Sequence, residues 1–182
     1  MVDLRERRQQ LVRDEVRAAA VALMADRGFD GVTVEQIAAN TSVSPSTIYR
    51  HFGTKEAMVL TPGRPAAVVE RVAADTKREA TAAIRRAVNR VYGKDERVPA
   101  ELQLASGNAA LSEHVARELA DVGDALAAAL ASRAGRKKPK LDDRARAAAT
   151  LAAVAVALLD WADAPDTKLT ALLDDALSVL SP

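Results

Sequence analysis

Two short segments with the signals of helix starts lie close together in this chain, and they constrain its fold more than any other feature. The first starts at Thr33, where Gln36 completes a capping box, in which each side chain bonds to the main-chain N–H of the other residue. The second starts at Ser44, a favoured N-cap, and continues with Pro45, whose missing N–H and fixed φ suit the first helical position. Residues 40–42 form the turn between them. This arrangement is typical of a helix-turn-helix, a motif that reads DNA.

The spacing after Ser44 separates a buried face of the second helix from an exposed one. An apolar stripe is formed by Val43, Ile48 and Phe52. The side chains that point away from this stripe are Pro45, Ser46, Thr47, Arg50 and His51. They are small, hydroxylated or basic, so they permit close approach to a major groove and offer hydrogen-bond donors to it. We therefore expect this face to contact DNA.

Several donors around this helix suit the DNA backbone. Arg50 can bond to a guanine edge or to a phosphate, and Tyr49, Thr47 and His51 can donate to phosphate oxygens. A further helix is predicted to begin at Thr54. Lys55 would then lie beside a positive helix end, which is a favourable place for a phosphate.

The stretch from about Arg5 to Met58 resembles the N-terminal domain of the TetR family of bacterial transcriptional regulators, and it covers about a third of the chain. The residues that carry the resemblance are Ala20, Gly28, Phe29, Thr33, Ile37, Ala38, Val43, Ser44, Thr47, Ile48, Tyr49, His51, Phe52, Lys55 and Glu56. The resemblance implies that phosphates are held by Thr33, Tyr49, His51 and Lys55. It implies that the residues nearest the bases are Pro45, Ser46, Thr47 and Arg50, with Ser44 at the start of the same helix.

The chain departs from the family pattern at two places. Thr41 and Ser42 stand in the turn where many members have Ala-Gly. The segment from Thr61 to Pro65 contains two prolines and a glycine, and it is expected to interrupt the helix that usually connects the two domains of the family. Mechanical coupling between the domains is therefore in question.

Composition defines the class of protein. The 182 residues are 49% apolar and 28% charged, which is typical of a globular chain, and no segment alternates with a period of two, so we predict an all-α fold. A net charge of +1 argues against a protein that coats nucleic acid without specificity. The lack of cysteine excludes disulfides and thiolate sites. No apolar run reaches the length of a membrane span and the N-terminus does not read as a signal peptide, so we expect a cytoplasmic protein.

We expect two domains. Residues 1–60 would form a three-helix DNA-binding domain around the helix-turn-helix, with a first helix from about Leu4 to Asp26. Residues 61–182 would form a helical domain for effector binding and dimerisation. Arg5, Arg7 and Arg8 could be either a frayed arm along the DNA or a solvated helix start.

The second domain should contain a series of helices. The expected ranges are about 66–74, 100–105, 142–161 and 166–180. In addition, a capping box of Thr76 and Glu79 is expected to open a helix that ends near Gly93, and Asn108 is expected to cap one long helix that runs to about Arg133. The basic stretch 135–140 fits a solvated loop better than a second nucleic-acid patch.

The last two helices carry the predicted dimer contacts. One presents a stripe of small residues, Ala145, Ala148, Ala149, Ala152, Val156 and Leu159, and the other presents Leu169, Leu172, Leu173, Ala176, Leu177 and Leu180. Small side chains permit close helix packing, so we predict a homodimer through about residues 142–180; the alternative is that both stripes pack within one chain. Two heads would then read a pseudo-palindromic site.

An effector pocket is expected between the reading head and the dimer helices, as the resemblance implies. Its candidate lining residues are Val72, Ile84, Val88, Tyr92, Leu104, Asn108, His114, Leu119 and Val122. Aliphatic residues with helical spacing also form ordinary core, and that alternative stays open.

Together these patterns predict a DNA-binding transcriptional regulator, in particular a ligand-responsive repressor that binds double-stranded operator DNA as a dimer. The alternative is an effector-independent architectural DNA-binding protein or a helical interaction module. An enzyme is not expected, because the sequence has no Gly-rich phosphate loop, no metal-spaced cluster and no nucleophile with a recognisable base. We accordingly expect no catalytic residue, no metal and no cofactor.

Overall fold

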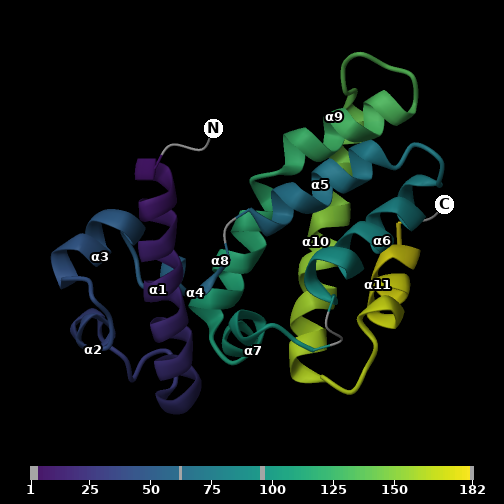
Figure 1. Ribbon diagram of the computed structural model, residues 1–182. Coiled ribbons are helices and arrows are strands. Elements are labelled where there is room, and N and C mark those ends of the chain that lie inside the picture. The colour runs from purple at the N-terminus through teal and green to yellow at the C-terminus, as the bar shows by residue number, and fades with distance from the viewer. Residues whose placement is uncertain (1–3, 62, 95–96, 181–182) are drawn as a thin grey trace. The chain divides into compact units, whose positions relative to one another are not determined.

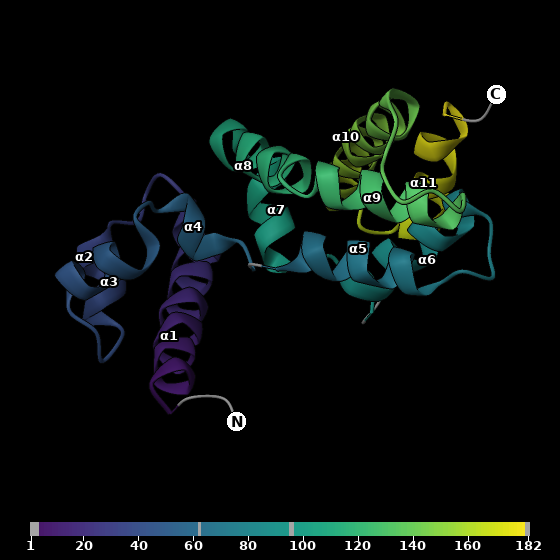
Figure 2. The ribbon, with the colours of Figure 1, turned by 90° about the horizontal axis from the view of Figure 1, so that it is seen from above.

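The computed structural model describes residues 4–61, 63–94 and 97–180, and the regular elements in these ranges are all helices (Figures 1 and 2). The predicted all-α fold is therefore confirmed. The chain divides into two compact units, Met1–Thr61 and Pro62–Pro182. The division falls beside the domain boundary expected from the sequence.

The first unit contains four helices, α1 (Leu4–Arg27), α2 (Val34–Ala39), α3 (Pro45–Phe52) and α4 (Glu56–Val59). Helix α1 packs against α2 and α4, and α2 packs against α3. The fully buried side chains of this unit are Val16, Ala20, Met24, Ile37, Ile48, Met58 and Val59. Arg5, Arg7 and Arg8 are exposed and lie within α1, so the structure supports the solvated helix start rather than a frayed arm.

Both predicted caps of the helix-turn-helix are formed. The Gln36 N–H donates to Thr33 Oγ1 at 3.3 Å, and the Thr33 N–H donates to Gln36 Oε1 at 3.0 Å. Ser44 Oγ accepts from the Thr47 N–H at 3.4 Å. Gly53 ends α3 with a φ of +72°, a backbone conformation that favours glycine. Residues within three positions of each helix start therefore determine where α2 and α3 begin.

The connection that follows α4 is interrupted as predicted. Helix α4 is a single turn that ends at Val59, and Leu60 is extended. The next helix, α5 (Arg64–Ala74), starts after Gly63, whose φ is +83°, and carries Pro65 in its first turn. Pro62 lies outside the described residues. No continuous helix therefore runs from Glu56 into α5.

The second unit is organised around one long helix. After α5 come α6 (Ala80–Tyr92), α7 (Ala100–Ser106), α8 (Ala109–Ala120), α9 (Gly123–Arg133), α10 (Leu141–Asp163) and α11 (Leu169–Ser178). Helix α10 packs against α7, α8, α9 and α11, whereas α5 packs against α6 and α9 (Figure 2). Ala147, Leu151, Val154 and Leu158 bury one face of α10 in this core.

The start of α6 differs from the prediction. Glu79 is itself the N-cap, since its carboxylate accepts from the Ala82 N–H at 3.2 Å, and the capping box of Thr76 with Glu79 is not formed. The reason lies in a distant residue: the Arg133 guanidinium from α9 donates to the carbonyls of Val72, Asp75 and Arg78. These hydrogen bonds hold residues 75–78 as a turn, so the helix begins later.

The predicted helix from Asn108 to Arg133 is divided in two. Asn108 does cap α8, because its Oδ1 accepts from the Leu111 N–H at 3.2 Å, but α8 ends at Ala120 and α9 begins at Gly123. Glycine inside a helix costs about 0.5–1 kcal/mol relative to alanine, so an interruption beside Gly123 is less costly than elsewhere. The prediction of one long helix was wrong at this position.

Helix α10 is also long and apolar enough to cross a membrane by length and composition, which corrects the expectation that no apolar run reaches that length. Half of the apolar stretch is buried inside the protein. A core helix of a soluble protein has the same character, so α10 alone is weak evidence for a membrane span.

Candidate DNA-binding site

The surface around α3 carries the side chains that the sequence singles out for DNA. We call Ser44, Pro45, Ser46, Thr47, Tyr49, Arg50 and His51 the α3 patch. Ser44, Ser46, Tyr49 and Arg50 are exposed, and Pro45, Thr47 and His51 are half-buried. Of the predicted apolar stripe, Ile48 and Val43 are buried but Phe52 is only half-buried, so the predicted division of this helix into two faces is present in part.

A chain of hydroxyl groups orders the first turn of α3. Ser44 Oγ lies 3.2 Å from Ser46 Oγ and donates to Thr47 Oγ1 at 3.0 Å. Arg50 Nη2 donates to the same Thr47 oxygen at 3.4 Å. Among the described residues no carboxylate forms an ion pair with Arg50, and a guanidinium has five N–H donors. Most of the hydrogen-bonding capacity of Arg50 is therefore free for a guanine edge or a phosphate.

Thr33 keeps one donor for DNA although it serves as a cap. Its Oγ1 accepts the Gln36 N–H, so the hydroxyl proton is not used in the cap. The side chain is exposed at the start of α2. A phosphate contact by Thr33 is thus compatible with the capping box, and it stays a prediction.

Lys55 is held more firmly than the sequence suggests. Its Nζ donates to the Phe29 carbonyl at 2.8 Å and to the Val32 carbonyl at 3.1 Å, and it lies 4.2 Å from the centroid of the Phe29 ring. An ammonium has three N–H donors, so one remains for a phosphate. The structure thus gives Lys55 a fixing role between α4 and the segment that leads into α2, beside the predicted DNA contact.

We expect Lys55→Met to lower the unfolding free energy by roughly 1–3 kcal/mol, because two carbonyls lose a charged donor and Phe29 loses its cation. Urea unfolding measures this change. If the third donor also meets a phosphate, the plot of log binding constant against log salt becomes shallower by about one unit for each lost contact. An unchanged slope would leave Lys55 with its structural role alone.

Glu15 holds the turn of the motif, a role that was not predicted from the sequence. Glu15 Oε1 accepts from the Ser42 N–H at 2.6 Å, and Oε2 accepts from Ser42 Oγ at 2.9 Å. The carboxylate thus fastens the turn between α2 and α3 to α1. Nothing in the local sequence marks this exposed glutamate, because its partner lies 27 positions away.

Arg17 makes a second set of contacts between α1 and later segments of the first unit. Its Nε donates to the Leu60 carbonyl at 2.9 Å, and its guanidinium carbon lies 5.7 Å from the centroid of the Phe52 ring at the end of α3. Glu15 and Arg17 together tie α1 to the turn before α3 and to the last residue of α3.

Replacing Glu15 with alanine should weaken operator binding about two- to tenfold, since a charge-assisted hydrogen bond that positions the start of α3 is lost. The control is Asp26→Ala, which removes an exposed carboxylate of α1 that does not reach the turn. Faster hydrogen exchange at the Ser42 amide, seen only in the Glu15 variant, would identify the cause. Equal affinity of both variants for DNA would rule out this positioning role.

The nine residues predicted to line an effector pocket are spread over the second unit. Val72, Ile84, Val88, Tyr92 and Leu119 are buried, and Leu104, Asn108, His114 and Val122 are half-buried. The cavities described in this unit are lined by other residues. The structure thus shows helical core at these positions, and their contact with a ligand stays a prediction.

Tyr92 belongs to a polar cluster at the start of α5. Arg64 lies 2.6 Å from Glu101, with its guanidinium carbon 5.4 Å from the Tyr92 ring centroid. Burial raises the pKa of the Tyr92 phenol, which is therefore protonated at neutral pH. Of the other polar candidates, His114 lies 3.9 Å from Glu118.

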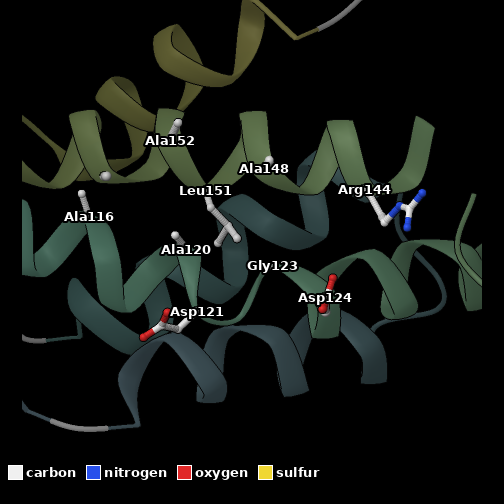
Figure 3. Close-up of a pocket in the computed structure, with 10 residues that line it drawn as sticks. Ala116, Ala120, Asp121, Gly123, Asp124, Arg144, Ala148, Leu151 and Ala152 are labelled. Carbon is white, nitrogen blue, oxygen red and sulfur yellow. The ribbon is translucent and has the colours of Figure 1, made fainter. Parts of the chain in front are cut away.

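A groove on the second unit is lined by small residues of α8, α9 and α10 (Figure 3). We call it the alanine groove. Its volume is about 370 Å³, and its lining consists of Ala116, Ala120, Asp121, Gly123, Asp124, Arg144, Ala148, Leu151, Ala152 and Ala155. Arg144 and Asp124 lie at one end of the view and Asp121 toward the other. Ala148 and Ala152 are exposed, so this face of α10 is open in the single chain.

The two stripes that were predicted to form the dimer differ in their exposure to solvent. On α10, Ala145, Ala148, Ala149, Ala152 and Val156 are exposed and Leu159 is half-buried. On α11, Leu169, Leu173 and Leu177 are buried within the chain, while Leu172 and Ala176 are half-buried, as is Leu180 just after the helix ends. Half of the leucine stripe thus packs internally, whereas the alanine stripe points outward.

Each of the two units matches a known protein family. Residues 16–61 match the family described as "Bacterial regulatory proteins, tetR family", and residues 76–182 match the one described as "MftR C-terminal domain". The HTH-type transcriptional regulator TcmR of Streptomyces glaucescens is 42% identical over 59 residues, which are 32% of this chain and 26% of that protein. The match thus spans about a quarter of the length of this curated relative.

Two solved structures resemble nearly the whole chain. The FadR of Thermus thermophilus, a TetR-family transcriptional repressor in complex with lauroyl-CoA, has a TM-score of 0.64 and 22% identity, with 92% of each chain covered. The transcriptional regulator FadR of Bacillus subtilis, in complex with stearoyl-CoA, has a TM-score of 0.51 and 22% identity, with 91% of this chain and 96% of that chain covered. At this identity the likeness supports the fold.

Proposed function

The chain belongs to the TetR family of bacterial transcriptional regulators, and on that premise we propose that it is a ligand-responsive repressor that binds a pseudo-palindromic operator as a homodimer. The observation that carries the proposal is the exposed face of α3. Its first turn is fixed by the Ser44 cap and by the clamp of Glu15 on Ser42, while Arg50 keeps most of its donors free.

The roles of individual residues follow from where they lie on this face. Small side chains at the start of α3 allow the helix to enter a major groove, so Pro45, Ser46, Thr47 and Arg50 would lie nearest the bases. Thr33, Tyr49, His51 and Lys55 would hold phosphates on either side, which positions the helix but carries little sequence information. Ser44 would support both by setting the helix start.

Dimerisation would bring two such heads to one operator. The exposed alanine stripe of α10 and the alanine groove beside it offer a surface where a second helix can approach closely. The groove carries Arg144 together with Asp121 and Asp124, so a two-fold related copy can set opposite charges against one another. Half-sites one or more turns of DNA apart, on the order of 34–36 Å each, would then be read together.

The effector would be a small molecule bound by residues 61–182. The two solved FadR structures are described as complexes with lauroyl-CoA and stearoyl-CoA, and this motivates a fatty acyl-CoA as the first class to test. A ligand acts only if it binds one arrangement of the protein better than another. We expect an effector to lower operator affinity by roughly 1–3 kcal/mol through that difference.

The protein would act in the cytoplasm, where bacterial DNA lies, and without catalysis. The interruption between α4 and α5 favours a second candidate, an effector-independent architectural DNA-binding protein, because no continuous helix connects the two segments. The two candidates differ in sequence specificity. A repressor binds its operator several orders of magnitude more tightly than random DNA, and an architectural protein does not.

The decisive experiment is selection of bound fragments from random DNA with the purified full chain. A pseudo-palindromic motif bound by two chains is the expected result, followed by release when lauroyl-CoA or stearoyl-CoA is added. Fragments without a shared motif would favour the architectural candidate. An operator complex unchanged by a bound acyl-CoA would remove that class as the effector.

A further inference from the structure

Another cavity in the second unit is lined by four arginines from separate segments. We call Arg78, Arg133, Arg136 and Arg146 the arginine cluster, and the cavity of about 430 Å³ that they line the arginine cleft. They come from the turn before α6, the last turn of α9, the loop after α9 and the early part of α10. The cleft thus lies where the starts of α6 and α10 meet the end of α9.

Two of the four arginines have a carboxylate partner. Arg78 lies 2.7 Å from Asp75, and its hydrogen bond lowers the pKa of that carboxyl. Arg136 pairs with Asp143, whose pKa is lowered by the Lys140 N–H and then by Arg136. Both carboxylates are therefore ionised at neutral pH and cancel two of the positive charges.

The positive charges of the other two arginines, Arg133 and Arg146, are not neutralised by an ion pair among the described residues. Arg133 donates to three main-chain carbonyls, which are neutral acceptors, and the described residues give Arg146 no ion pair. Asp142 is the remaining acidic residue in the lining. The adjoining loop adds three exposed lysines, Lys137, Lys138 and Lys140. The four arginines and three lysines therefore outnumber the nearby described carboxylates Asp75, Glu79, Asp142 and Asp143, so the cleft and its rim are positive.

The cluster is also organised before any ligand binds. Arg133 is fixed by its bonds to the carbonyls of Val72, Asp75 and Arg78. The Nε of Arg136 is buried and has no hydrogen-bond partner in the described part of the chain. A buried donor without an acceptor is unusual in folded proteins, and a phosphate oxygen that reached the Nε of Arg136 would satisfy it.

We propose that the arginine cleft binds a small organic phosphate of about the size of a nucleoside diphosphate. Guanidinium groups suit phosphate because they offer two parallel N–H donors to its oxygens, and several of them on separate elements suit more than one phosphate group. A volume of about 430 Å³ exceeds the need of a single inorganic ion and lies in the range of small-molecule sites.

The cleft would hold the phosphate end of the effector, and this part of the inference rests on the acyl-CoA class proposed above. Arg133 Nη1 bonds to the carbonyl of Val72 at 3.1 Å, and Val72 is one of the residues predicted to line an effector pocket. This hydrogen bond links one arginine of the cleft to the main chain of α5, the helix that carries Val72.

The test is calorimetric titration of the full chain with ADP, with coenzyme A that carries no acyl group, and with pyrophosphate, at constant ionic strength. Arg146→Ala is the variant of choice, because Arg146 is exposed and its loss breaks no ion pair given by the described residues. Arg90→Ala, an exposed arginine of α6 outside the cleft lining, is the matched control. We expect Arg146→Ala to weaken binding of ADP and coenzyme A about tenfold or more, with the control unchanged.

Three outcomes would overturn the proposal: no binding of any of the three probes, equal weakening by both variants, or wild-type affinity in Arg146→Ala. The same variants test the acyl-CoA effector independently of the phosphate site. If acyl-CoA binds and releases DNA equally in wild type and Arg146→Ala, the cleft is not its phosphate site, although acyl-CoA is the effector. If ADP and coenzyme A require Arg146 but acyl-CoA leaves operator affinity unchanged, the phosphate site stands without that effector.

Discussion

Arg50→Ala is expected to weaken binding to the selected operator by roughly 1–3 kcal/mol and to relax the preference at one base position of each half-site. The reason is that Arg50 is exposed on α3, and the described part of the chain engages it only through a 3.4 Å contact with Thr47. Its remaining donors can form the paired hydrogen bonds that distinguish guanine from other bases. Fluorescence anisotropy with the operator and with single-base variants of it measures both effects.

Two other variants separate base reading from backbone contact. Tyr49→Phe removes only a hydroxyl and should weaken binding to all sequences alike, because a phosphate contact carries no base information. Arg27→Ala removes an exposed guanidinium at the end of α1 that pairs with Asp26, so operator binding should stay close to that of the wild type. Equal losses on every sequence for Arg50→Ala would reassign Arg50 to a phosphate.

Ala152→Asp is expected to separate the proposed dimer and to weaken operator binding by at least about two orders of magnitude. Ala152 is exposed near the middle of α10 and lines the alanine groove, so the single chain should tolerate the change within about 0.5 kcal/mol. In a two-fold interface each of the two chains would bury one introduced carboxylate without a partner. The effective cost is several kcal/mol per ion. Sedimentation velocity and operator titration measure the two consequences.

The control for Ala152→Asp is Ala73→Asp, which places the same charge on an exposed alanine of α5. Ala148→Asp, on the same groove, should reproduce the effect of Ala152→Asp. A stable dimer in both groove variants would show that the chains associate through another surface. A wild-type protein that is monomeric at micromolar concentration would contradict the dimer itself.

Features set by neighbouring residues were predictable. The caps at Thr33 and Ser44 each use groups within three positions, and the first helix ends at Gly28, which bonds to Met24 four positions back and has a φ of +75°. The start of α6 was not predictable in this way. It is set by Arg133, which is 55 positions from Arg78 and carries no local signal of that contact.

The DNA-binding face followed the same rule. The exposure of Ser46 and Arg50 was predicted from helical spacing. The contacts that hold this face were not: Glu15 reaches Ser42 across 27 positions, and Lys55 reaches Phe29 across 26. The effector residues illustrate a different difficulty. Val72 and Val88 have the same apolar character whether they line a cavity or fill a core, and spacing cannot distinguish these cases.

The eight residues of α3 are too few to stay helical by themselves, because isolated helices shorter than about 12–15 residues are marginal in water. The shape of this segment therefore exists only while the surrounding unit is folded around the buried Ile48 side chain. It follows that a peptide covering residues 44–53 would be a poor oligonucleotide ligand. Conversely, bound duplex should raise the melting temperature of this unit and protect it from proteases, because DNA binds only the folded form.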